Sequence, residues 1–322
     1  MPQATGAQAS FNIYDEDTFG QDPGTPDGEK VYVTKFGIGS SQGRTQSATL
    51  TSSRAAARPT LSNEDAGGDL GLEVAPESIG KLLKHTMGDL VTTGAGPYTH
   101  TLKLGDLPTS FMAEKDYGVN ISGVGRFEKY NGCRVNGAKF NFPQEGAPTC
   151  NFSVKGAGMT QAASALDATI TDNGHNIFSA FESSIEEGGA ASTVITSLDL
   201  DVSNNLDEGG YVIGGGGKRK QLPEGQAIVT GQFTALFEDT TLLNKAINNT
   251  ESSLKITLTR GDGLGSAGNE SIEFLLSQLV YERQSPPIEG PSGVLITMAF
   301  TSYLKGTDNG LVITLKNALA TI

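Results

Sequence analysis

The sequence has no tryptophan, and it has only two cysteines and three histidines among its 322 residues. Two cysteines are too few for the disulfide framework that holds a small secreted scaffold together. The histidines, His85, His100 and His175, have no partner at metal-ligand spacing, and neither HExxH nor CxxC occurs. The sequence therefore predicts no metal site and no cofactor.

The two cysteines, Cys133 and Cys150, flank a predicted β-hairpin formed by residues 133–142 and 149–155. A turn midway between these strands leaves the two sulfur atoms about five residues out of register, or about 15–20 Å along a strand. Because a disulfide needs Cα atoms within about 7 Å, we expect two free thiols. Free thiols are consistent with assembly in a reducing cytoplasm.

Long apolar runs are also missing, so no segment of the chain is expected to cross a bilayer. The first residues lack a basic start and an apolar core, so we expect no secretory signal. The chain has 23 basic and 36 acidic residues, a net charge of −13, which gives it no electrostatic reason to bind nucleic acid or an anionic membrane. Residues 1–160 hold 14 basic and 17 acidic side chains, so most of the negative charge follows them.

Two glycine-rich stretches resemble nucleotide-binding motifs but lack their context. Residues 263–268 match GxGxxG, yet a strand-like segment follows them where the dinucleotide fingerprint needs a helix. Residues 214–217 precede Lys218, Arg219 and Lys220, but the spacing and the Ser or Thr of a P-loop are missing. We interpret the first stretch as a hairpin loop and the second as a mobile basic loop tip. With no catalytic constellation in the sequence, we predict that the protein is not an enzyme.

Most periodic segments alternate between apolar and polar residues, as strands do. The strand-like segments are residues 31–36, 69–74, 98–104, 198–202, 229–237, 254–258, 272–281 and 294–303. Helices are few. We expect one over residues 76–87, one beginning after Asp239, and a third short one over residues 176–185. The pattern predicts a mainly β fold.

The two clearer helices reveal an internal repeat. Val74 and Phe237 end the strands that precede them, and these residues are 237 − 74 = 163 positions apart. Leu70 and Phe233 have the same separation. We interpret the repeat as a duplication that gives two tandem domains, each a β-sandwich or barrel with a short flanking helix.

The repeat also predicts the domain boundaries. The first domain covers residues 1–160, the second covers residues 176–322, and the linker lies at about 161–175. Each domain contains a long polar loop, at residues 39–68 and 203–224. Loops of this length usually have a function, so we expect them to be mobile in the free subunit and to pack on neighbours in an assembly. The alternative is a pair of plain disordered loops.

Several segments together resemble the tail tube proteins of long-tailed bacteriophages, in a two-domain form. The segments that carry the resemblance are residues 6–13, 16–20, 70–83, 107–115, 130–137, 146–156, 198–206 and 223–237. The resemblance implies small β-sandwich or barrel domains with a flanking helix, arranged in six-fold rings. The inner sheets of such rings join into a hollow tube that guides DNA.

This resemblance implies a structural virion protein that is assembled in the host cytoplasm and located in the tail. The implied partners are copies of the chain and other tail proteins, such as the terminator, tip and tape measure. DNA is expected only in transit, without specific binding, and no membrane partner is expected. The residues alone leave two alternatives: a decoration protein or adhesin built from two β-sandwich modules, and an enzyme whose site is not visible.

Alternation selects candidate residues for the inner wall of such a tube. The apolar residues of segment 198–202 are expected in the core, so its acidic residues point to the opposite side. The lumen candidates chosen in this way are Asp69, Glu73, Asp199, Asp201, Gln232 and Thr234. The alternative is an outward face that is merely solvated. The candidates for contacts between subunits are Arg54, Arg58, Lys218, Arg219 and Lys220.

A duplicated chain also predicts the number of copies in a ring. Three chains supply six domains, and because the two domains differ in charge, the ring has only pseudo-six-fold symmetry. The alternative is a ring of six chains, in which one half lines the tube and the other half decorates its outside.

Overall fold

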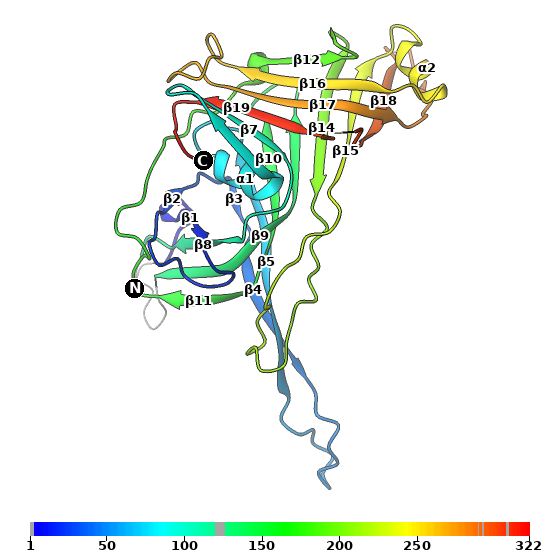
Figure 1. Ribbon diagram of the computed structural model, residues 1–322. Helices are drawn as coiled ribbons and strands as arrows, with labels where there is room; N and C mark the ends of the chain where they lie inside the picture. Colours follow the sequence, from blue (N-terminus) through cyan, green and yellow to red (C-terminus); the bar gives the residue numbers. More distant parts are fainter. Residues whose placement is uncertain (1–2, 120–125, 289, 292, 307–308) are drawn as a thin grey trace.

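The computed structural model describes residues 3–119, 126–288, 290–291, 293–306 and 309–322, and its segments are mostly antiparallel strands (Figure 1). In the first half the strands are β1 (Ser10–Glu16), β2 (Glu29–Lys30), β3 (Lys35–Phe36), β4 (Gly39–Thr45), β5 (Thr60–Glu73), β6 (Gly88–Thr93), β7 (Tyr98–Leu104), β8 (Ser110–Asp116), β9 (Phe127–Phe142), β10 (Thr149–Gly156) and β11 (Gly158–Ala162). In the second half they are β12 (Ser183–Glu187), β13 (Ala190–Ala191), β14 (Ile195–Ser203), β15 (Ile228–Leu236), β16 (Ser252–Thr259), β17 (Ser271–Tyr281), β18 (Leu295–Ser302) and β19 (Val312–Asn317). The predicted mainly β fold is confirmed.

Helical structure is limited to short elements. They are α1 (Gly80–Met87), α2 (Thr241–Ile247) and the 3-10 turns η1 (Gly6–Gln8) and η2 (Ala180–Glu182). α2 begins two residues after Asp239, whose carboxylate accepts a hydrogen bond from the Thr241 backbone N–H at 2.7 Å, but the N-cap position is Thr240, without a side-chain cap. In the described ranges, no helix has the length and apolar character needed to cross a membrane.

A central sheet crosses from the first half of the chain into the second. Its strands pair antiparallel in the order β4–β5–β10–β9–β14–β15–β18. The seam between the halves joins β9 to β14, with Phe142 opposite Leu198 and Gly137 opposite Ser203. The two halves are therefore joined by backbone hydrogen bonds as well as by the linker.

β9 is long enough to take part in two layers. Its first residues pair with β8 and β11 in an outer sheet of order β2–β1–β8–β9–β11. From Arg134 onward it pairs with β10, and from Gly137 also with β14, in the central sheet. β17 is shared in the same way, because it pairs with β16 and β19 and then, at Leu279–Tyr281, with β18.

The strand partners of the second half repeat those of the first. The pairs β1–β8, β8–β9, β9–β11, β4–β5 and β5–β10 correspond to β12–β16, β16–β17, β17–β19, β14–β15 and β15–β18. A helix follows β5 and β15 alike. The first copy also contains the hairpin β6–β7, which is inserted between α1 and β8. Its strand β7 pairs with β19 of the second half. This order is what a duplication produces, while the domain boundaries at 160 and 176 stay a prediction.

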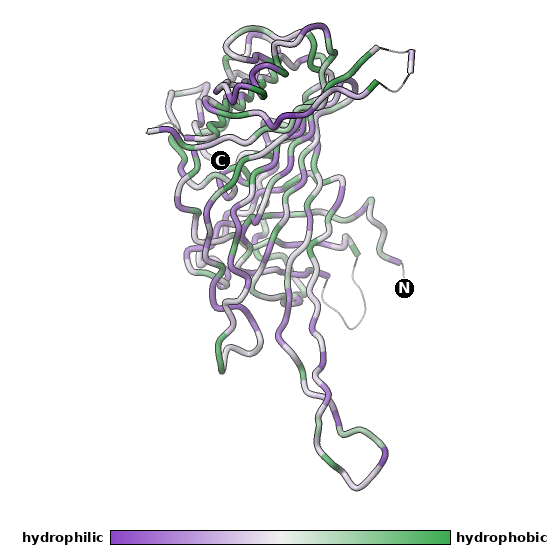
Figure 2. Tube along the Cα trace, turned by 90° about the vertical axis from the view of Figure 1, so that its right-hand side faces the viewer, coloured by the Kyte–Doolittle hydropathy of each residue, from purple (hydrophilic) through white to green (hydrophobic). Residues whose placement is uncertain are grey.

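One hydrophobic core runs through both halves. The Phe140 and Phe142 rings of β9 lie 5.0 and 5.4 Å from the Phe274 ring of β17, across the seam. α1 buries Leu82 and Met87 in the same core. Figure 2 shows hydropathy changing from residue to residue along the strands, and it shows the β4–β5 arm standing away from the body of the molecule.

The predicted third helix over residues 176–185 is wrong. This segment is extended, then forms the single turn η2, and then enters β12. Ser179 and Glu182 form a capping box, with the Ser179 N–H donating to the Glu182 carboxylate at 2.7 Å, but the box supports one turn only. The residues that follow pair with β16, and this strand pairing replaces the helix.

Two other local predictions are also corrected. Within residues 31–36, only Lys35 and Phe36 belong to a strand. The segment 39–68 is not a loop, because β4 and β5 pair along it as far as Thr45 and Thr60. Backbone pairing does not require apolar side chains, so a polar, glycine-rich hairpin gives no alternating signal.

Candidate functional site

A continuous polar face covers the side of the central sheet opposite the core. One row across six strands contains, in order, Glu73, Thr149, Asn141, Asp199, Gln232 and Ala299. The next row contains Gly71, Asn151, Lys139, Asp201, Thr230 and Thr301. The six lumen candidates, Asp69, Glu73, Asp199, Asp201, Gln232 and Thr234, all lie on this face. We call it the polar face, and its assignment to a lumen stays a prediction.

The apolar residues between these positions fix which side is polar. The buried side chains of the same strands include Leu70, Leu72, Phe140, Phe142, Phe152, Leu198, Leu200, Val202, Phe233, Met298 and Phe300. A slip of one residue in any strand would bury its polar set and expose its apolar set, so burial holds the register. The acidic residues are therefore on this face because the alternating apolar residues cannot leave the core.

Hydrogen bonds tie the polar face across strands. The Asn141 side-chain amide donates to Asp199 at 2.7 Å, and the Gln232 amide donates to the same carboxylate at 3.2 Å. A shallow groove on this face is lined in part by Lys139, Asp201 and Glu282. These groups make a hydrophilic surface with carboxylates in excess.

The predicted intersubunit residues differ in their surroundings. Arg54 and Arg58 are exposed on the connection between β4 and β5, and Lys220 is exposed between β14 and β15. Lys218 is partly buried, and Arg219 is only 5% exposed. The expectation of a freely mobile basic tip therefore does not hold for Arg219.

Arg219 anchors the β14–β15 connection to the first half of its own chain. Its guanidinium donates to the backbone oxygens of Gly156 at 2.9 Å and Glu208 at 3.0 Å, and to the Asp65 carboxylate at 2.6 Å. The Tyr211 hydroxyl adds a hydrogen bond to the Glu64 backbone oxygen at 2.8 Å. Sequence reasoning missed this anchor because most of its acceptors are backbone carbonyls, which leave no mark in a sequence.

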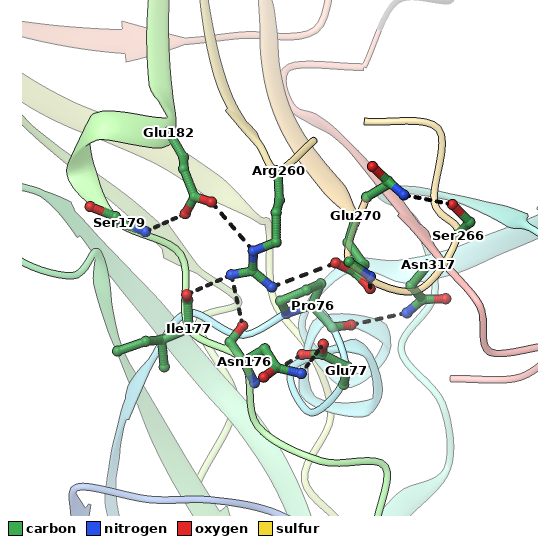
Figure 3. A network of polar contacts seen from close by, with 12 residues as sticks. Pro76, Glu77, Asn176, Ile177, Ser179, Glu182, Arg260, Ser266, Glu270 and Asn317 are labelled. Atoms are coloured by element: carbon green, nitrogen blue, oxygen red, sulfur yellow. Dashed lines mark hydrogen bonds and ion pairs between the residues drawn. The ribbon is translucent and has the colours of Figure 1, made fainter. Parts of the chain in front are cut away.

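A second polar network joins residues 176–182, which directly follow the predicted linker, to both halves (Figure 3). The Arg260 guanidinium donates to the Ile177 backbone oxygen at 2.6 Å and to the Glu182 carboxylate at 3.3 Å. Nearby, the Asn176 side-chain amide donates to Glu77, just before α1, at 2.9 Å. The network holds residues 176–182 in one path.

Burial and local hydrogen bonds explain the shifted pKa values of four further groups. Burial raises the pKa of the Cys133 and Cys150 thiols, and both cysteines are free, as predicted. Burial opposes ionisation of Asp15, but hydrogen bonds from His85 and Lys84 outweigh it and hold the Asp15 pKa well below its usual range. Burial lowers the pKa of His85, which lies 2.7 Å from this carboxylate. Within the described ranges, no three His, Cys, Asp or Glu residues gather as a metal site.

Comparison with known proteins agrees with the architecture. Residues 6–302 match the family described as "Phage tail tube protein". No curated protein sequence matches the chain. The match covers both halves, including the seam and every strand of the central sheet.

Proposed function

The chain belongs to the phage tail tube protein family, and we propose that three copies close into a ring whose polar faces together line a channel for DNA. Membership of this family makes the chain a structural component of the virion tail that assembles with copies of itself and with other tail proteins. We further propose that these three-chain rings stack into the tube through which DNA passes.

One observation carries the proposal: the central sheet is continuous across both halves and has a single polar face. A chain with one half inside and one half outside a tube would not need this continuity. The repeated strand order gives each chain two similar units, so three chains supply six. Heterologous contacts of this kind close into a ring when the rotation per unit divides a full turn.

The charge of the polar face suits a channel for DNA. The carboxylates of this face, Asp69, Glu73, Asp199, Asp201 and Glu282, outnumber its three lysines, Lys35, Lys139 and Lys155. Lys155 pairs with Glu208 at 2.9 Å, and Arg134, opposite Lys155, pairs with Glu224 at 2.7 Å. A surface that neutralises phosphates binds DNA, whereas an acidic surface repels it. DNA can therefore pass without being retained.

Electron microscopy with thiol labelling tests the proposal. Purified protein is expected to form hollow tubes in negative stain. In tubes of Asp201→Cys, a maleimide too large to enter the channel should label the cysteine at least tenfold less than in free subunits. Asn248→Cys, at an exposed position directly after α2, is the control for general protection. Monomers under all conditions, or equal labelling at Asp201 in tubes and subunits, would overturn the proposal.

A further inference from the structure

The second half contains the position that corresponds to the seam, but among the described residues the strand pairing there is incomplete. In the first half, Gly137–Phe142 of β9 lie between β10 and β14. In the second half β17 takes the position of β9, but it pairs with β18 only at Leu279–Tyr281 and then ends. In the described part of the chain, Leu295–Met298 of β18 therefore have no strand partner on the side away from β15.

The residues after β17 begin to pair along this unpaired edge of β18. The Glu282 backbone N–H donates to the Ala299 oxygen at 2.8 Å, which extends the register of Tyr281 opposite Phe300 by one pair. Residues 282–285 are exposed. Pro286 and the proline after it cannot donate to a ladder, so an added strand is limited to about four residues.

The opposite end of the central sheet presents the matching edge. β3 and β4 hold the place in the first half that β14 holds in the second: Phe36 pairs with Leu70 as Leu198 pairs with Phe233. Their outer side has no strand partner among the described residues. Residues 36–41 contain no proline, and apart from the first and third residues their side chains are small. Such an edge is open to pairing with another strand.

We propose that a second copy of the chain completes the seam, with residues 282–285 of one copy pairing antiparallel with residues 38–41 of the next. The internal seam supplies the register. Gly137 faces Ser203 there, and the corresponding pair between copies is Glu282 with Ser41. The inference rests on the proposed ring and adds which edges meet and in which register.

The β4–β5 arm supports this arrangement. In the second half, the β14–β15 connection crosses the seam and is anchored on the first half by Arg219. Its counterpart, the connection between β4 and β5 at residues 46–59, stands away from its own chain in Figure 1 and is mostly exposed. A seam between copies would lay this arm on the second half of the neighbouring copy. Arg54 and Arg58 would then hold a position similar to that of Arg219.

Paired cysteines test the register. Tubes of Ser41→Cys/Glu282→Cys, oxidised after assembly, are expected to give reducible cross-links at least tenfold above those of Lys35→Cys/Glu282→Cys. The control places its cysteine on the same edge, six residues from Ser41, about 20 Å along the strand, whereas a disulfide needs Cα atoms within about 7 Å. Each single variant reports cross-linking through the native cysteines, both of which are buried. In a ring of three copies, the cross-linked ladder ends at the trimer.

The outcomes separate this inference from the proposed function. Tubes that form without cross-links above the control overturn the seam and leave the tube in place, whereas failure of the wild-type protein to form rings or tubes overturns the proposed function. A ladder that continues to six chains overturns the three-copy ring. If the double variant does not assemble, hydrogen exchange on wild-type protein decides. The amides of residues 38–41 and 282–285 should exchange at least tenfold more slowly in tubes, and unchanged exchange overturns the seam.

Discussion

Replacing Arg219 with alanine is expected to destabilise the subunit itself, before any assembly. The guanidinium is almost fully buried, and it donates to the backbone oxygen of Gly156 on the first half at 2.9 Å and to that of Glu208, within the connection itself, at 3.0 Å. Alanine removes the donor and leaves these carbonyls facing a gap. The Arg219→Ala change therefore tests whether the β14–β15 connection is anchored on the first half of its own chain.

The expected cost is about 2–4 kcal/mol in the free energy of unfolding. Hydrogen bonds to a charged group contribute about 1.5–3 kcal/mol each, and partial hydration of the freed carbonyls lowers their sum. The ion pair with Asp65 adds little, because the Asp65 side chain is 58% exposed and solvent screens the attraction. Most of the loss therefore comes from the backbone acceptors.

Urea unfolding of the monomeric subunit measures this cost. Lys220→Ala is the matched control, since it removes the same charge from the next residue, whose side chain is exposed, and should change stability by less than about 0.5 kcal/mol. Arg219→Lys should recover only part of the loss, because an ammonium group cannot reach acceptors in several directions as a guanidinium does. If Arg219→Ala and Lys220→Ala have equal stability, the anchor is not formed and the reasoning fails.

Three further predictions concern the core, pH and the polar face. Phe178→Ala should cost about 3–5 kcal/mol in urea unfolding, whereas Phe181→Ala, at a side chain 88% exposed, should cost less than about 0.5 kcal/mol; similar costs would contradict the extended path of this segment. The Asp15 pKa is held below its unfolded value near 3.9, so its stabilisation is present above about pH 4 and is lost as the pH falls further. The stability gap between wild type and Asp15→Asn, measured by urea unfolding, should therefore close on acidification, and a gap independent of pH would contradict the lowered Asp15 pKa. Asp201→Lys tubes should retain double-stranded DNA in a salt-dependent filter-binding assay where wild-type tubes do not, and equal retention would count against a channel lined by this face.

The faces of the strands could be predicted from the sequence, because alternation is a local property. Leu198 and Leu200 specify one side of β14, and this places Asp199 and Asp201 on the other side whatever the neighbouring strands are. Family resemblance added the function. The seam between β9 and β14 could not be predicted, since Gly137 has no side chain and so gives no indication of its partner, Ser203.

The failures have physical causes as well. The apolar residues of segment 176–185 have helical spacing, but pairing of Ser183–Glu187 with β16 satisfies more backbone groups than a short isolated helix would. The anchor at Arg219 could not be found because its neighbours in the sequence are lysines and glycines, which favour a solvated loop. Charge alone does not show whether a basic side chain lies in solvent or caps backbone carbonyls.

The most direct test of the central claim is cryo-electron microscopy of assembled tubes, reconstructed without imposed ring symmetry. We expect three chains per ring, both halves of each chain in the wall, and the polar face with Asp199 and Asp201 toward the channel. Six equivalent copies of the whole chain in one ring, or this face turned away from the channel, would contradict the claim.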